Sequence, residues 1–169
     1  MSGGRYRVRF WRSAYRVAWS LRGAFWLMPW PHMNGAMTAV WVGDRVLMVR
    51  NSYNDYFTFP GGRLDSGEGF AEAAARELSE ETAVSLPPDA LKLAVGLDRA
   101  RPFGQARLEI FECRLPARPE VVPDAVEIAE HHWWPASEAL SRTLYGPVRA
   151  YLEATGDRGP EIATLVEES

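Results

Sequence analysis

The chain has 169 residues, of which 47% are hydrophobic and 24% are charged, and its formal net charge is −3. This composition is typical of a globular domain and excludes a wholly disordered chain, while the small net charge excludes an overall field that attracts nucleic acid. The single cysteine, Cys113, excludes a disulfide framework and a cysteine-based zinc site, so we expect a cytoplasmic protein.

The first 34 residues are basic and rich in aromatic side chains. Between positions 5 and 22 they carry six arginines and no acidic residue. The arginines interrupt any apolar run, which argues against a secretory signal and against a membrane span. We expect an amphipathic helical appendage over residues 1–34 that packs on the domain or forms a homodimer contact; contact with a membrane surface is the alternative.

Residues 35–155 are expected to form one mixed α/β domain, followed by an acidic tail over 156–169. Alternating or continuous apolar residues, bounded by turn signals such as Gly43-Asp44, predict strands at 36–42, 45–50, 91–100, 106–115 and 126–135. Helix-forming residues predict helices at 69–83 and 136–154, the second interrupted near Gly146-Pro147. This order favours helices on both faces of a central sheet.

The first helix has a clear buried side. Phe70, Ala74 and Leu78 recur every fourth residue, which gives one apolar stripe along the helix. Ser66 lies in the region where an N-cap is expected, just before this helix.

Acidic residues are concentrated near the C-terminal end of the same helix. Glu77, Glu80 and Glu81 are spaced so that they share one helical face, where three carboxylates repel each other. A solvated charged surface is the ordinary explanation of such a run. Here a glycine pair, Gly61-Gly62, lies upstream and permits close approach of a ligand to the backbone. Carboxylate and carbonyl oxygens are the ligands that Mg²⁺ or Mn²⁺ prefers.

The spacing of these residues resembles the signature of the Nudix hydrolases. That signature reads G-x5-E-x7-R-E-U-x-E-E-x-G-U, where U is aliphatic, and this chain matches it from Gly62 through Glu68 to the run Arg76–Val84. One fixed position differs, because Ala83 stands where the family has glycine. If that glycine serves a left-handed helix exit, alanine there costs about 1 kcal/mol and removes no ligand.

The resemblance implies an α/β/α sandwich with a mixed central sheet and hydrolysis of a nucleoside diphosphate linked to another moiety, or of a nucleoside triphosphate. It assigns Glu77, Glu80, Glu81 and the carbonyl of Gly62 to a divalent metal, Mg²⁺ or alternatively Mn²⁺. It assigns Arg76 and Glu68 to orienting these acids, with Gly61 as part of the supporting loop. The implied partner is a nucleotide-type small molecule, and we expect no nucleic acid.

The identity of the general base is left open between two places. Metal-activated water needs a carboxylate to accept its proton. Within the helix, Glu77 or Glu80 is the nearest candidate, whereas many family members use an acid from a later loop. Glu127 and Glu130 lie where that loop is expected, and we favour Glu127; a surface charge without function is the alternative.

Three further residues are candidates for substrate binding. Arg50 and Arg63 could each hold phosphate through two hydrogen bonds or could be solvated surface arginines. Phe57 could stack on a nucleobase, although aromatic residues beside a strand are more often part of the core. His131 and His132 are adjacent on an expected strand and point to opposite faces, so we interpret them as structural.

A second class of function fits the same fold. A Nudix-fold module that binds or senses a nucleotide such as ADP-ribose without cleaving it usually lacks some of the signature acids. This chain has all four signature glutamates, which favours an enzyme.

Overall fold

The computed structural model describes residues 34–101 and 104–158. The appendage predicted over residues 1–34, except for Asn34, lies outside the described residues, as does the acidic tail beyond Arg158. Within the described ranges, none of the helices has the length and apolar character needed to cross a membrane.

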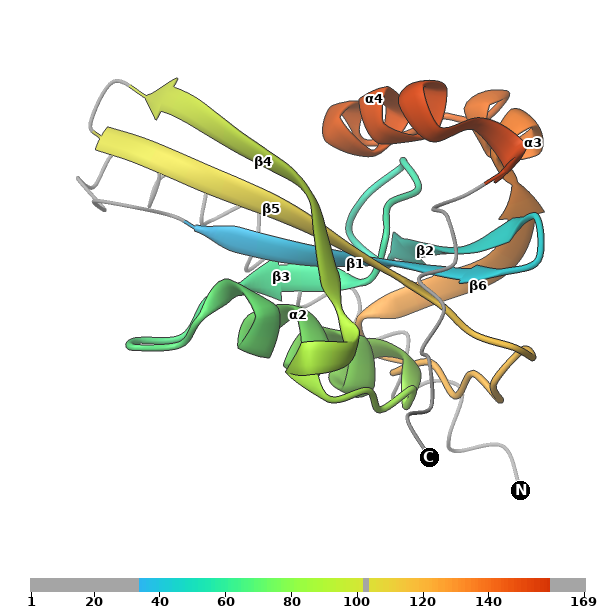
Figure 1. Ribbon diagram of the computed structural model, residues 1–169, viewed down its shortest axis with the longest axis horizontal. Coiled ribbons are helices and arrows are strands. Elements are labelled where there is room, and N and C mark those ends of the chain that lie inside the picture. Colours follow the sequence, from blue (N-terminus) through green and yellow to red (C-terminus); the bar gives the residue numbers. More distant parts are fainter. Residues whose placement is uncertain (1–33, 102–103, 159–169) are drawn as a thin grey trace, which may run out of the picture.

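A mixed sheet forms the centre of the molecule (Figure 1). Its order is β4-β5-β1-β2-β6, with β3 paired to β1 outside this path. β1 runs parallel to β5, and the other pairings are antiparallel, so the predicted mixed α/β class is confirmed. The strands are β1 Gly35–Val42, β2 Arg45–Asn51, β3 Gly61–Arg63, β4 Lys92–Arg101, β5 Gly104–Arg114 and β6 Ile128–Pro135.

The predicted hairpin and strands agree with these elements, with one exception. Gly43 adopts a φ of 61° in the turn between β1 and β2, as the Gly-Asp signal predicts. β3 is the strand that the sequence analysis missed, because two of its three residues are glycine, which has a low preference for strands. It forms because Ala36 and Met37 of β1 pair with Gly62 and Gly61.

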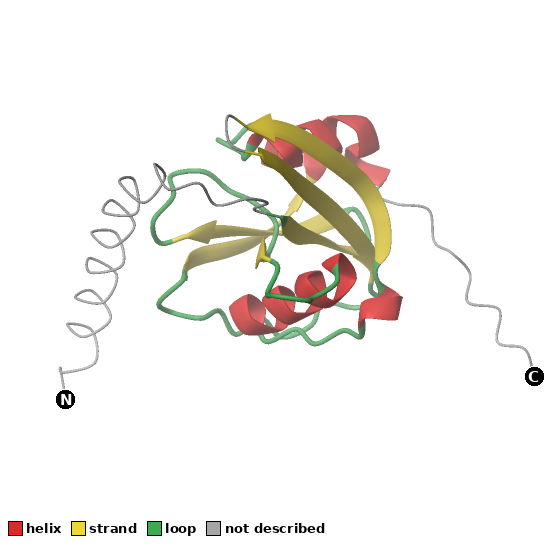
Figure 2. Ribbon diagram, turned by 90° about the vertical axis from the view of Figure 1, so that its left-hand side faces the viewer, coloured by secondary structure: helices red, strands yellow, loops and turns green. Residues whose placement is uncertain are grey.

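Helices cover both faces of the sheet, as predicted (Figure 2). α2 (Phe70–Thr82) packs below the sheet in Figure 1, and α3 (Ala136–Leu140) and α4 (Gly146–Thr155) lie above it. The helical region is interrupted between α3 and α4. Pro147 lies in the first turn of α4, where the missing N–H of proline costs no hydrogen bond. Single 3₁₀ turns lie at Pro88–Ala90 and Gly156–Arg158.

Each face of the sheet carries its own apolar core. On the α2 face, Leu78 and Ala74 pack against Val40 and Leu47. On the other face, Trp41 and other side chains, including Phe59, Ile110, Val148 and Leu152, form the second core. Complete burial of a large apolar side chain contributes about 1.5–3 kcal/mol, so these two clusters fix the sheet between the helices.

The start of α2 differs from the prediction. The N-cap is Gly69, whose N–H donates to the Glu72 carboxylate at 2.9 Å, and not the region of Ser66. The chain first makes a tight turn in which the Glu68 N–H donates to the carbonyl of Asp65 at 3.1 Å, with Gly67 at a φ of 82°. Ser66 lies inside this turn, so the N-cap falls three residues later, at Gly69, while the helix itself starts within one residue of the prediction.

Candidate functional site

The acidic side chains of α2 occupy three different environments. Glu81 is 3% exposed, the side chain of Glu77 is 15% exposed, and that of Glu80 is 60% exposed. The shared face predicted from their spacing therefore contains two enclosed carboxylates and one at the surface. A solvated charged surface does not account for Glu77 and Glu81, because carboxylates are rarely buried unless they are paired or bind a ligand.

Glu81 is held between two separate segments. Its two oxygens accept hydrogen bonds from the N–H of Gly61 at 2.9 Å and from the side-chain amide of Asn51 at 3.2 Å. Burial raises the pKa of Glu81 to about 8, and the negative charges of Glu77 and Glu127 act in the same direction. The two hydrogen bonds oppose this change without cancelling it.

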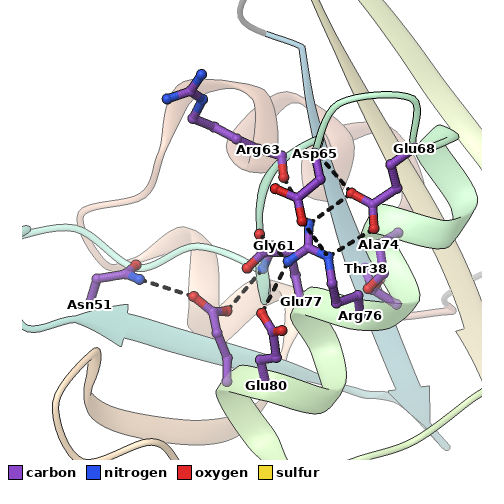
Figure 3. A network of polar contacts seen from close by, with 11 residues as sticks. Thr38, Asn51, Gly61, Arg63, Asp65, Glu68, Ala74, Arg76, Glu77 and Glu80 are labelled. Atoms are coloured by element: carbon purple, nitrogen blue, oxygen red, sulfur yellow. Dashed lines mark hydrogen bonds and ion pairs between the residues drawn. The ribbon is translucent and has the colours of Figure 1, made fainter.

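Glu77 faces one positive group and two negative ones. Its carboxylate lies 3.0 Å from the Arg76 guanidinium, which also bonds Glu80 at 3.0 Å (Figure 3). Burial nevertheless raises the pKa of Glu77, and the charges of Glu80 and Glu127 add to this effect. Glu77 and Glu81 thus share an excess of negative charge that the residues around them only partly offset.

Arg76 joins the loop before α2 to the helix itself. It binds the Glu68 carboxylate through two hydrogen bonds of 2.8 and 2.9 Å and donates to the carbonyl of Arg63 at 2.9 Å. The hydrogen bond to Arg76 is the main cause that lowers the pKa of Glu68 to about 2. The Arg63 side chain points away from this cluster (Figure 3).

The two glycines of β3 are required by space. A Cβ on Gly61 would overlap the carbonyl oxygen of Ala36, and the φ of 155° at Gly61 is unfavourable for any other residue. A Cβ on Gly62 would overlap the carboxylate of Glu77. The backbone of β3 therefore approaches the acidic side of α2 as closely as a residue without a side chain allows.

Glu127, favoured from the sequence as the loop acid, lies in the turn just before β6. Its charge acts on both Glu77 and Glu81, so the three carboxylates share one region although 46 residues separate Glu81 from Glu127. Glu130 instead pairs with Arg50 at 2.5 Å and with His132 at 3.1 Å. Of the two loop candidates, Glu127 acts on the acidic side chains of α2, whereas Glu130 is paired elsewhere. The identity of the general base, Glu127, Glu77 or Glu80, stays a prediction.

The donor chemistry of this region fits a hard divalent cation. The negative charges of Glu77 and Glu127 act on Glu81, and that of Glu127 acts on Glu77, so a cation would offset their repulsion. Within residues 34–101 and 104–158, no three acidic, His or Cys side chains converge closely enough to enclose an ion. A cation site here would therefore require these carboxylates to move closer together. The assignment of Glu80 and the Gly62 carbonyl to the metal stays a prediction.

The three candidates for substrate binding lie in different settings. The Arg50 guanidinium is used in its ion pair with Glu130 and in a hydrogen bond to the carbonyl of Asn54 at 3.3 Å, which favours the structural interpretation. Phe57 contacts His132 and Trp134 with ring centroids 5.7 and 4.8 Å apart, which favours a core role. Arg63 is exposed, and its binding of phosphate stays a prediction.

Three further residues, which were not among the predicted site residues, support the site. Asn51 bonds Glu81, while Ser52 and Asp124 hold the turn that carries Glu127. The hydrogen bond from Asn51 to Glu81 leaves no local pattern in the sequence, because it joins positions 30 residues apart. Asp124 does have a local signal, because an Asp side chain at the start of a turn often accepts hydrogen bonds from the backbone two or three residues later.

A comparison with models of protein families matches residues 31–154 to the NUDIX domain. The chain belongs to the NUDIX domain family. The match covers the sheet, the acidic helix and the Glu127 turn, so the resemblance inferred from the signature is confirmed. A search of curated proteins finds no match.

Solved NUDIX structures share this fold at low sequence identity. The MutT protein from Methanosarcina mazei Go1 has a TM-score of 0.62 at 19% identity, over 75% of this chain and 94% of that one. The E. coli dihydroneopterin triphosphate pyrophosphohydrolase has a TM-score of 0.59 at 20% identity, over 74% and 97%. The NUDIX domain of Shewanella oneidensis NrtR, complexed with ADP-ribose, has a TM-score of 0.63 at 17% identity, over 73% and 86%. These likenesses establish the predicted sandwich fold.

Proposed function

We propose that this protein hydrolyses the pyrophosphate bond of a nucleoside diphosphate derivative or of a nucleoside triphosphate, with Mg²⁺, or alternatively Mn²⁺, as cofactor. The observation that carries the proposal is the pair of enclosed carboxylates, Glu77 and Glu81, whose pKa values are both raised. Such crowding costs stability in the absence of a cation, which makes it a mark of a functional site.

The residues of the chain have separate tasks in this reaction. Glu77, Glu80 and Glu81, with the Gly62 carbonyl, would hold the cation. When bound, the cation supplies charge stabilisation for the pyrophosphate oxygens and lowers the pKa of water. Arg76, itself held by Glu68, fixes the orientation of Glu77. Glu127 accepts the proton of the attacking water, with Glu77 and Glu80 as the alternatives.

Support for the substrate class comes from proteins that share the fold. One is a dihydroneopterin triphosphate pyrophosphohydrolase, and another is a NUDIX domain complexed with ADP-ribose. Both ligands carry phosphates joined by an anhydride bond. Arg63 follows Gly62 in β3, and its exposed side chain points away from the acidic cluster (Figure 3). It is the residue we propose for contact with a substrate phosphate, which would require a change in its side-chain conformation.

The test is the formation of nucleoside monophosphate, separated by chromatography, from a panel of nucleoside diphosphate derivatives and nucleoside triphosphates with Mg²⁺. We expect turnover of at least one member, and a loss of about a hundredfold in Glu77→Gln, Glu80→Gln and Glu81→Gln, because each removes a charged metal ligand. Glu153→Gln, an exposed acid on α4, is the control. The proposal is wrong if the wild type binds nucleotide but cleaves no member of the panel.

That last result would favour a second function, a module that binds a nucleotide such as ADP-ribose without cleaving it. The observation in its favour is the ADP-ribose complex of a NUDIX domain with the same fold. All four signature glutamates remain in this chain, which supports hydrolysis over binding alone.

We also propose a cytoplasmic location, on the ground of the single cysteine, which is buried and unpaired. The proposal that residues 1–34 contact a membrane surface or a second copy has a direct test. Co-sedimentation with anionic vesicles and the oligomeric state are compared for the full chain and for a version that begins at Gly35. Equal behaviour in both measurements would contradict it.

A further inference from the structure

The turn that carries Glu127 is attached to the end of the acidic helix. The N–H of Val122 donates to the carbonyl of Thr82 at 2.9 Å, and the N–H of Asp124 donates to the carbonyl of Glu81 at 3.0 Å. These carbonyls belong to the last turn of α2, where helical partners run out. The left-handed conformation of Ala83 turns the following chain away from the helix axis, and the 122–127 loop takes the free acceptors.

Asp124 also organises the loop from within. Its Oδ1 accepts hydrogen bonds from the N–H of Val126 at 2.7 Å and from the N–H of Glu127 at 3.4 Å. Its carbonyl accepts the N–H of Ile128 at 2.8 Å. One exposed residue thus accepts hydrogen bonds from three consecutive N–H groups, at 126, 127 and 128, which include that of Glu127.

Ser52 holds the same loop from the other side. Its N–H donates to the carbonyl of Glu127 at 2.7 Å, and its hydroxyl donates to the carbonyl of Val126 at 2.8 Å. Ser52 directly follows Asn51, whose side chain bonds Glu81. The loop is therefore attached to the end of α2, which carries Glu81, and to the residue after Asn51, which bonds Glu81.

We propose that Asp124 and Ser52 are positioning residues that hold the backbone of Glu127 at the acidic end of α2. An aspartate turn by itself is common at a protein surface. Here three independent attachments converge on the residue that completes the acidic group: the loop on α2, the Asp124 carboxylate and Ser52. The consequence for catalysis rests on the proposed function above, whereas the effect on the loop backbone does not.

Three variants of the full chain test this arrangement. Asp124→Ala removes the side-chain acceptor, Asp124→Asn keeps an Oδ1 acceptor without the charge, and Ser52→Ala removes one attachment to Val126. Glu120→Ala, an exposed acid on the same connection, is the control. Unfolding midpoints by urea establish that each variant is folded.

Amide hydrogen exchange measures the protection of the loop backbone directly and needs neither substrate nor metal. We expect the N–H groups of Val126 and Glu127 to exchange at least about tenfold faster in Asp124→Ala, because both lose an acceptor, and at near wild-type rates in Asp124→Asn and in Glu120→Ala. Unchanged exchange in Asp124→Ala would overturn the proposal.

Steady-state kinetics measure how these variants change the hydrolysis reaction. We expect Asp124→Ala to lower kcat at least about tenfold with KM within about twofold, and Ser52→Ala to lower kcat in the same direction. Asp124→Asn should keep kcat within about threefold of wild type. Wild-type kcat in Asp124→Ala, or an equal loss in both Asp124 variants, would overturn the proposal. A wild-type protein that cleaves no substrate would refute the proposed function, while hydrogen exchange still decides the positioning.

Discussion

Arg76 and Glu68 are joined by two parallel hydrogen bonds, from Nε to Oε1 at 2.8 Å and from Nη2 to Oε2 at 2.9 Å. The same guanidinium reaches Glu77 and Glu80 at 3.0 Å. One planar cation therefore orients three carboxylates and links the β3–α2 loop to the helix. A lysine cannot reproduce these contacts, because its ammonium is a single point charge.

Arg76→Lys should therefore impair both the site and the fold. We expect kcat to fall at least about tenfold, and the free energy of unfolding to fall by about 1–3 kcal/mol, because hydrogen bonds to charged groups are lost. Steady-state kinetics and urea unfolding measure the two effects. Arg142→Lys, at an exposed arginine remote from the cluster, should change neither by a comparable amount. A wild-type kcat and a wild-type free energy of unfolding in Arg76→Lys would contradict the role of Arg76 in orienting the three carboxylates.

The raised pKa of Glu81 should make the stability of the metal-free protein depend on pH. Its pKa in the folded protein is about 8, above the ordinary value of 4.5, so the folded state binds a proton that the unfolded state has released. The stability that Glu81 contributes is then full below about pH 4.5 and is lost as the pH rises towards 8.

Glu81→Gln removes this titration. The difference in unfolding free energy, variant minus wild type, should rise by about 1–3 kcal/mol between pH 5 and pH 8.5 in the presence of a chelator. Any constant cost of the lost acceptor cancels in this comparison. Urea unfolding at both pH values measures the difference, and Glu153→Gln should give a flat profile. A difference that does not change with pH would show that Glu81 titrates normally.

Ala83 has a φ of 59°, and among the residues with described backbone it is the one non-glycine residue with a positive φ. Its N–H donates to the carbonyl of Ser79 at 2.9 Å and closes the helix. The left-handed exit expected from the signature is thus kept without glycine. The strain of about 1–2 kcal/mol exceeds the extra freedom that glycine has in the unfolded state.

Ala83→Gly should accordingly raise the free energy of unfolding by about 0.5–1 kcal/mol and leave metal affinity unchanged. Ala150→Gly, at an exposed position inside α4, should have the opposite sign, with a loss of about 1 kcal/mol. Thermal or urea unfolding separates the two. A loss of stability in Ala83→Gly would mean that the exit carries no strain.

Substitution of the two glycines of β3 should have two different effects, one on activity and one on stability. In Gly62→Ala the new methyl group meets the end of a flexible side chain, Glu77, which can move aside. We expect near wild-type stability and at least about tenfold lower kcat, because Glu77 is displaced. In Gly61→Ala the methyl group meets the backbone of Ala36, so we expect a loss of stability of about 2 kcal/mol or more. Unfolding curves and kinetics for both variants measure the contrast, and equal stability of the two would contradict it.

The sequence predicts the main elements of this fold because their signals are local. The apolar stripe of α2, the glycine turn at 43 and the Gly146-Pro147 break act within a few residues, and each appears in the structure where the pattern indicates. β3 escapes because its pairing with β1 overrides the low strand preference of glycine.

The site is predictable only in part, for the same reason. The spacing of the glutamates identifies the acidic face, but it does not indicate that Glu81 is enclosed while Glu80 is exposed. That difference depends on Asn51 and Gly61, which lie 30 and 20 residues away and reach Glu81 only through the sheet. The attachment of the Glu127 turn to α2 is likewise a tertiary contact without a local pattern.

The central claim is that the crowded carboxylates of Glu77 and Glu81 form a divalent cation site. Titration with Mn²⁺ followed by electron paramagnetic resonance tests it without a substrate. We predict saturable binding to the wild type, at least about tenfold weaker binding to Glu81→Gln, and unchanged binding to Glu153→Gln. Binding to Glu81→Gln as tight as to the wild type, or no saturable binding to the wild type, would contradict the claim.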